Sequence, residues 1–146
     1  MATSNLAVLL VEDNPDDADL LQRSLADANA KVDIDWAETL SAGLALCAEK
    51  TFDLVLLDLS LPDSHGLPSV QRALEQAPQI PIVVLTGLDD EALGASAVHA
   101  GAQDFLIKGR MDGRTLARAM SYAVERHRLV ADLEQSNAIK TYFAAT

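Results

Sequence analysis

The 146-residue chain contains one cysteine, few aromatic residues and half as many basic residues as acidic ones. The lone Cys47 excludes an internal disulfide, and no cluster of cysteine and histidine indicates a zinc site. With 11 Lys and Arg against 22 Asp and Glu, the formal net charge is −11. Such a molecule repels nucleic acid and anionic membranes, so neither is an expected partner.

Long apolar runs are also absent. No stretch approaches the ~20 apolar residues that span a bilayer, so membrane insertion is not expected. Residues 1–5 carry neither the basic region nor the apolar segment of a secretory signal, which predicts a cytoplasmic location. Almost half of the residues are hydrophobic, and the length suits one domain with a sizeable core.

Short apolar runs alternate with segments of helical period. Strands are expected at residues 6–11, 32–36, 52–57, 80–85 and 105–107, each followed by a helix, the last running from Arg114 to about Asn137. Strand 32–36 alternates apolar with acidic residues, which is typical of a partly exposed edge strand. Five β-α repeats predict an α/β fold, a five-stranded parallel sheet with helices on both faces. The flavodoxin-like order 2-1-3-4-5 would place strand 32–36 at an edge.

Local signals mark where the helices begin. Asn14 and Pro15 are typical of an N-cap followed by the first helical residue. Thr39 or Ser41 is expected to cap the second helix. The segment 91–100 is rich in alanine and offers few large side chains to a core, which predicts a loosely held helix.

Polar side chains follow four of the five expected strands. Glu12 and Asp13 follow the first, Asp58 the third, Thr86 the fourth and Lys108 the fifth. Because the carboxyl ends of parallel strands share one edge, these residues are expected to converge on one site. Three carboxylates repel one another unless a cation lies between them, and oxygen ligands suit Mg²⁺. With an ammonium and a hydroxyl nearby, such a site suits a phosphoryl group carried on a carboxylate.

Four segments resemble the receiver domain of two-component response regulators over about residues 5–125: LLVEDNPDD, LVLLDLSLPDSHGL, IVVLTG and AGAQDFLIKG. The resemblance implies phosphorelay signalling, in which Asp58 takes a phosphoryl group from a phosphohistidine. The donor would be a sensor histidine kinase or a phosphotransfer protein. The protein would not be an enzyme, beyond supporting its own aspartyl phosphorylation and dephosphorylation.

The resemblance also implies a metal set around the phosphoacceptor. Asp13 and Asp58 would bind Mg²⁺, and the backbone carbonyl of Ser60 would supply a further oxygen. Glu12 would act mainly through a water molecule.

A second group of residues would sense the phosphoryl group. Lys108 would pair first with the Asp58 carboxylate and then with the phosphoryl oxygens, while Thr86 would turn inward to bond one of them. Phe105 would change rotamer with Thr86 and so reshape the face formed by the last two helices and the last strand. Ser60 and Leu88 would tune the lifetime of the phosphoryl group.

Two residues depart from the family pattern. Phe105 stands where tyrosine is common, so no hydroxyl can lock its inward rotamer. Gly109 follows Lys108 where the family usually has a proline with a cis peptide bond. A cis bond before any other residue costs ~3 kcal/mol, so a trans bond or an altered loop is expected here.

Helical pattern continues past the expected end of a receiver domain. We expect residues 1–125 to form the receiver and residues 126–146 to extend its last helix. Val130 and Leu133 continue an apolar seam, so the extension is interpreted as a linker to an output domain or as a dimerisation element. The chain would then act on an output domain or effector protein, or form a homodimer. His127 is expected to be a surface residue without a role.

The same fold can carry other functions. A nucleotide or flavin site needs a glycine-rich loop after the first strand, where this chain has Glu12, Asp13, Asp16 and Asp17. A phosphohydrolase would need a second aspartate where Ser60 stands. A degenerate receiver that acts only as a protein-interaction module remains the alternative.

Overall fold

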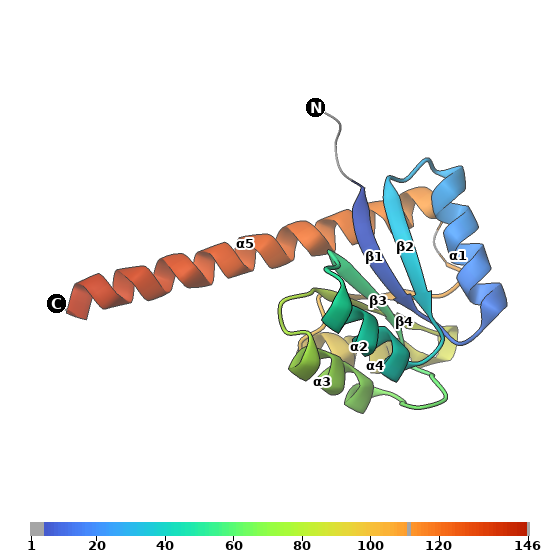
Figure 1. Ribbon diagram of the computed structural model, residues 1–146, viewed down its shortest axis with the longest axis horizontal. Helices are drawn as coiled ribbons and strands as arrows, with labels where there is room; N and C mark the ends of the chain where they lie inside the picture. The colour runs from blue at the N-terminus through green and yellow to red at the C-terminus, as the bar shows by residue number, and fades with distance from the viewer. Residues whose placement is uncertain (1–4, 111, 146) are drawn as a thin grey trace.

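The computed structural model describes residues 5–110 and 112–145, with side chains described as far as Glu134. Within these residues, strands and helices alternate as shown in Figure 1. The elements are β1 (Leu6–Val11), α1 (Pro15–Asp27), β2 (Val32–Ala37), α2 (Leu40–Glu49), β3 (Leu54–Asp58), α3 (Leu67–Gln76), β4 (Ile82–Thr86), the 3-10 helix η1 (Leu88–Asp90), α4 (Glu91–Ala100), β5 (Asp104–Ile107) and α5 (Gly113–Ala145).

The five strands form one parallel sheet with the order β2-β1-β3-β4-β5. β2 lies at an edge, and only Ala37 among its residues is buried. β3 lies at the centre and is buried along its whole length. The predicted flavodoxin-like α/β fold is therefore confirmed.

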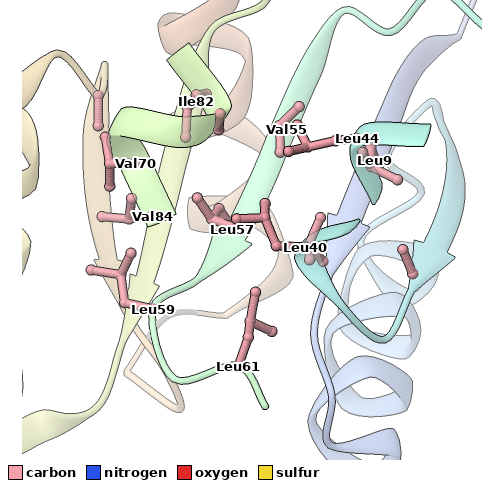
Figure 2. Packing of buried hydrophobic residues seen from close by; sticks show 14 of the residues in the cluster. Leu9, Leu40, Leu44, Val55, Leu57, Leu59, Leu61, Val70, Ile82 and Val84 are labelled. Carbon is pink, nitrogen blue, oxygen red and sulfur yellow. The ribbon is translucent and has the colours of Figure 1, made fainter. Parts of the chain in front are cut away.

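Successive residues of each strand point to opposite faces of the sheet, which divides the core in two. Leu9, Val55 and Val84 belong to the cluster under α2, α3 and α4, which Figure 2 shows from close by. Val8 and Leu56 belong to the cluster under α1 and α5. Because both faces are covered, the central strands are apolar throughout rather than alternating.

Two strands begin later than the apolar runs predict. β3 begins at Leu54. Just before it, the Asp53 N–H still donates to the Ala7 carbonyl, but the Ala7 N–H donates to the Asp53 carboxylate at 2.8 Å. β4 begins at Ile82, because the preceding Pro81 has no N–H to donate to a sheet.

Side-chain oxygens cap both early helices. Asn14 Oδ1 accepts the N–H groups of Asp16 and Asp17, as the sequence predicts. Of the two candidates for the second cap, the structure selects Thr39, whose hydroxyl accepts the Ala42 N–H at 3.1 Å. Backbone N–H groups in the first turn of each helix thereby find acceptors in a nearby side chain.

A third cap comes from a distant loop and was not predicted. Asp63, which follows β3, accepts the Leu40 N–H and the Ser41 N–H of α2, each at 3.0 Å. Burial alone would raise the pKa of Asp63, but these two donors hold it below its ordinary value. The β3–α3 loop, which follows Asp58, is thereby fixed to the start of α2.

Replacing Asp63 with alanine is expected to lower the free energy of unfolding by about 1 kcal/mol, the usual cost of losing a helix cap. Urea denaturation at neutral pH measures the change, and Asp89→Ala in η1 is the control. Because the folded-state pKa is lowered, the stabilisation is present above the ordinary aspartate pKa. It disappears as the pH falls through the lowered value. Equal stability of the two variants would contradict the capping role.

The last helix is longer than the periodicity predicts. α5 begins at Gly113 and continues to Ala145, well past the body of the molecule in Figure 1. Leu116, Met120 and Ala123 are buried against the sheet. Within the described ranges, none of the helices combines the length and apolar character needed to cross a membrane.

One expectation about the extension is corrected. Val130 is 46% exposed and Leu133 is 61% exposed, and the interpretation of the extension as a linker or a dimerisation element stays a prediction. His127 is not a bare surface residue: its Nε2 lies 3.0 Å from the carbonyl oxygen of Gln79, and its Nδ1 lies 3.4 Å from Gln103 Nε2. His127 therefore holds α5 to the end of the sheet opposite the strand termini that carry Glu12 and Asp58.

Candidate functional site

The polar residues that end the strands all lie at one edge of the sheet. Strand alternation places them on its two opposite faces. Glu12, Asp58 and Lys108 fall on the side that faces α1 and α5, while Thr86 follows Val84 on the side that faces α4. Glu12, Asp58 and Thr86 are buried. The predicted residues therefore meet at the carboxyl ends of β1, β3, β4 and β5.

The Lys108 ammonium lies among three carboxylates. It bonds Glu12, and its Nζ lies 3.2 Å from Asp58 Oδ2 and 3.1 Å from Asp17 Oδ2. Asp58 is held from its other oxygen, because the Ser60 N–H donates to Asp58 Oδ1 at 3.1 Å. The Asp58 carboxylate is thus fixed in place by one ammonium and one backbone donor.

Burial and the short distances between these groups shift their pKa values in different directions. Burial, followed by the neighbouring Asp58 carboxyl, raises the pKa of Glu12 to about 8. Burial alone would also raise the pKa of Asp58, but Glu12, the Ser60 N–H and Lys108 together lower it. Burial would lower the pKa of Lys108, but the carboxylates around it raise it. These shifts favour the anionic form of Asp58 and the cationic form of Lys108, and they favour the protonated form of Glu12 relative to an exposed glutamate.

The acidic residues fit a hard divalent cation. Glu12, Asp13 and Asp58 each offer one carboxylate oxygen, and these oxygens all lie within 4.8 Å of one another. Among the described residues, Glu12 Oε2 is buried without a hydrogen-bond partner. An unpaired buried oxygen is costly unless something bonds it. A carboxylate-bound Mg²⁺, which keeps several of its waters, would meet that need.

Thr86 presents a free hydroxyl at the same edge. It is buried, and within the described part of the chain Oγ1 has no hydrogen-bond partner. Phe105 is half-buried and lies on the same face of the sheet, against α4. A Cβ built on Gly94 would come within 2.6 Å of Phe105 Cγ, so the ring rests directly on the backbone of α4.

The loop after Lys108 has the altered shape that the sequence predicts. No cis peptide bond occurs among the described residues, and Gly109 adopts a φ of +79°. This left-handed conformation favours glycine. Leu88, in η1, follows Thr86 by two residues and is 58% exposed, and Ser60, two residues after Asp58, is also exposed.

A family model for the response regulator receiver domain matches residues 8–120. The chain belongs to the response regulator receiver family. As a receiver, it takes part in phosphorelay signalling of two-component systems through phosphorylation of an aspartate.

Curated relatives agree with this assignment. The response regulator PilR of Pseudomonas aeruginosa is 36% identical over 105 residues, covering 72% of this chain and 23% of PilR. KdpE, the KDP operon transcriptional regulatory protein of Escherichia coli, is 37% identical over 120 residues, covering 82% of this chain and 52% of KdpE. The receiver chain thus spans between about a quarter and about half of the length of these relatives.

Solved structures share the fold. The chain superposes on NtrX of Brucella abortus with a TM-score of 0.76 and 26% identity, over 90% of this chain and 29% of NtrX. A CheY-like receiver protein of Methanospirillum hungatei gives a TM-score of 0.67 at 24% identity, over 86% of this chain and 98% of that one.

Two residues near the receiver site were not predicted. The sequence marked Asp17 only as one of the acids that argue against a nucleotide site, yet it contacts Lys108. Trp36 donates its indole N–H to the carbonyl oxygen of Glu12 at 2.6 Å. No sequence signal singles out Trp36, but its alternation in the edge strand beside β1 could have placed it next to Glu12. As the single tryptophan, it is a built-in fluorescence reporter of this site.

Proposed function

We propose that Asp58 is the phosphoacceptor of this receiver and takes its phosphoryl group from a phosphohistidine on a sensor histidine kinase or phosphotransfer protein. The geometry around Asp58 carries the proposal. Its buried carboxylate lies at a strand end, bonded by Ser60 N–H and 3.2 Å from the Lys108 ammonium. Glu12 and Asp13 complete an acidic cluster beside it.

The transfer needs an ionised nucleophile and neutralised charge. The lowered pKa of Asp58 keeps its carboxylate ionised. One Asp58 oxygen forms a bond to phosphorus as the P–N bond of the phosphohistidine breaks, and the electron pair of that bond leaves with the imidazole. Lys108 offsets the charge of the transferring oxygens. Glu12, Asp13, Asp58 and the Ser60 carbonyl would hold Mg²⁺, which supplies further charge neutralisation when bound.

The same edge supplies the response to the phosphoryl group. The unpartnered Thr86 hydroxyl donates to a phosphoryl oxygen, and the movement of Thr86 opens space toward which the Phe105 ring turns. The added charge thereby biases two arrangements of the face formed by α4, β5 and α5. Ser60 and Leu88, which border the site, set how readily water reaches the phosphoryl group.

Intact mass spectrometry tests phosphoryl acceptance. Incubation with acetyl phosphate and Mg²⁺ is expected to add the mass of one phosphoryl group to the protein, and EDTA is expected to prevent the gain. If acetyl phosphate is inert, a purified phosphohistidine donor replaces it. No gain from either donor would favour the degenerate interaction module.

Magnesium affinity is expected to rise with pH between about 6 and 8. Below about pH 8 the buried Glu12 holds a proton that cation binding must displace, because its pKa is raised to about 8. Each pH unit can therefore strengthen binding by up to about tenfold, and the slope flattens above the pKa. The same raised pKa means that stability of the metal-free protein falls as the pH rises through this window.

Titration of Trp36 fluorescence with Mg²⁺ at several pH values measures this slope. Glu12→Gln is the matched variant, because its amide keeps the shape but has no proton to lose. It is expected to bind Mg²⁺ more weakly and with little pH dependence. An equal slope in both proteins would show that another group releases the proton.

The remaining assignments rest on the family. We propose that the chain acts on an output domain or effector protein, with no direct contact to nucleic acid, and that residues 126–146 link it to that partner or join two copies. The proposed chemistry is limited to its own aspartyl phosphorylation and dephosphorylation. The cytoplasmic location stays a prediction.

A further inference from the structure

Strand alternation and the bond from the Lys108 N–H to the Thr86 carbonyl set the side of the sheet on which Lys108 lies, whereas its carboxyl partners set where the ammonium at the end of the side chain points. β5 ends at Ile107, and the exposed Gly109 that follows has open space around it and a φ of +79°. A lysine stem is flexible, and glycine adds backbone freedom beside it. A cavity of about 240 Å³ lies along this stem, lined by Lys108, Gly109 and leucines of α1 and α5. The stem is therefore not enclosed by tight packing.

The three N–H groups of the ammonium are matched by oxygens of three carboxyl groups. Glu12 and Asp58 belong to the strand ends of the site itself. The third acceptor, Asp17 Oδ2, comes from α1 and lies 3.1 Å from Lys108 Nζ. Asp17 approaches from a different element, so the ammonium is held between α1 and the sheet edge.

Asp17 stands on a fixed part of the chain. Its N–H donates to Asn14 Oδ1, and the next residue, Ala18, is fully buried with its N–H bonded to the Asn14 carbonyl. Pro15 restricts the backbone of the same turn. The first turn of α1 therefore presents the Asp17 carboxylate in one place, although the side chain itself is 42% exposed.

We infer that Asp17 is a positioning residue for phosphoryl transfer. By holding one N–H of the ammonium, with Glu12 holding a second, Asp17 directs the third at Asp58. When Asp58 carries a phosphoryl group, Lys108 gives that third N–H to a phosphoryl oxygen and keeps the other two bonds. The inference rests on the proposed role of Asp58 and Lys108.

A different result is expected if the Asp17–Lys108 ion pair plays no part in phosphoryl transfer. Surface ion pairs contribute little, and an aspartate that acted only by its charge would repel an anionic donor. Removing it would then lower the donor concentration for half-saturation and leave the limiting rate unchanged. Loss of a positioning residue lowers the limiting rate instead. A misplaced Lys108 ammonium stabilises the transition state less well.

The test is the rate of phosphoryl gain at increasing acetyl phosphate with saturating Mg²⁺, followed by intact mass. Asp17→Asn and Asp17→Ala are expected to lower the limiting rate about tenfold without raising the half-saturating concentration. Asp17→Glu, which keeps the carboxylate, should restore part of the rate. Asp16→Asn removes the same charge from the neighbouring exposed residue and should match the wild type.

The outcomes separate the two proposals. A limiting rate in Asp17→Asn equal to that of the wild type, or a change in half-saturation alone, would overturn the positioning role while leaving Asp58 as acceptor. Loss of rate in Asp16→Asn as large as in Asp17→Asn would also overturn it. If the wild type gains no phosphoryl group from any donor, the proposed function fails first and the role of Asp17 fails with it.

Discussion

Asparagine at position 58 is expected to abolish phosphoryl gain completely. The amide has nearly the shape of the carboxylate but lacks its nucleophilic anionic oxygens. The single amide oxygen can still accept from the Ser60 N–H, while Lys108, which bonds the other Asp58 oxygen in the wild type, keeps Glu12 and Asp17. The variant should therefore fold as the wild type does, and intact mass after incubation with acetyl phosphate and Mg²⁺ should show no added phosphoryl group.

Asp63→Asn is the matched control for this variant. Asp63 lies in the loop that follows β3, five positions after Asp58, and its carboxylate caps α2 instead of facing Lys108. It should gain a phosphoryl group at the wild-type rate with a small loss of stability. A full gain in Asp58→Asn, or a loss in Asp63→Asn as severe, would place the acceptor elsewhere.

Alanine at position 113 is expected to destabilise the fold by about 2–4 kcal/mol. Gly113 begins α5 where this helix crosses α1. A Cβ there would overlap the carbonyl oxygen of Ser24 and lie 2.6 Å from its carbonyl carbon. Helix propensity alone predicts the opposite, since alanine is favoured over glycine by about 1 kcal/mol within a helix. Because the clash is with backbone atoms, which cannot move to another rotamer, the steric cost is expected to exceed the gain in helix propensity.

Urea denaturation of Gly113→Ala against the wild type measures this effect. Gly87→Ala is the control, because its φ is −79° and the nearest atom to its Cβ would be Asp90 Oδ2 at 3.9 Å. The control should change stability by less than about 0.5 kcal/mol. A Gly113→Ala midpoint at or above that of the wild type would mean that α5 can move away from α1 without cost.

The fold and the principal site residues could be predicted because they follow from local patterns. Apolar runs on both faces mark buried parallel strands, and the alternating acids of β2 mark an edge. Once the strand order is known, Asp58, Thr86 and Lys108 must share one edge of the sheet. No packing detail is needed for that conclusion.

Some contacts were not indicated by the sequence, because they depend on how the helices, strands and loops pack against one another. Asp16, Asp17 and Asp19 are equivalent as acids at a helix start, and only the burial of Ala18 rotates α1 so that Asp17 faces Lys108. Asp63 bonds residues more than twenty positions away, through a loop whose path periodicity does not describe. These contacts are consequences of tertiary structure.

The extension of α5 shows what helical periodicity cannot predict. Apolar residues at helical spacing indicate a face, but not whether anything lies against it. Val130 and Leu133 lie six and nine residues after the buried Val124, which turns them away from the side of α5 that packs on the sheet, and both are exposed. Periodicity therefore predicted the helix, but whether the extension serves as a linker or a dimerisation element stays a prediction.

Chemical location of the phosphoryl group tests the central claim most directly. Borohydride reduces an aspartyl phosphate to homoserine, so wild-type protein treated with acetyl phosphate, Mg²⁺ and then borohydride can be digested and its fragments sequenced by mass. The account predicts homoserine at position 58 alone. Homoserine at Asp13 or Asp63, or a phosphoryl gain that leaves no homoserine at position 58, would contradict it.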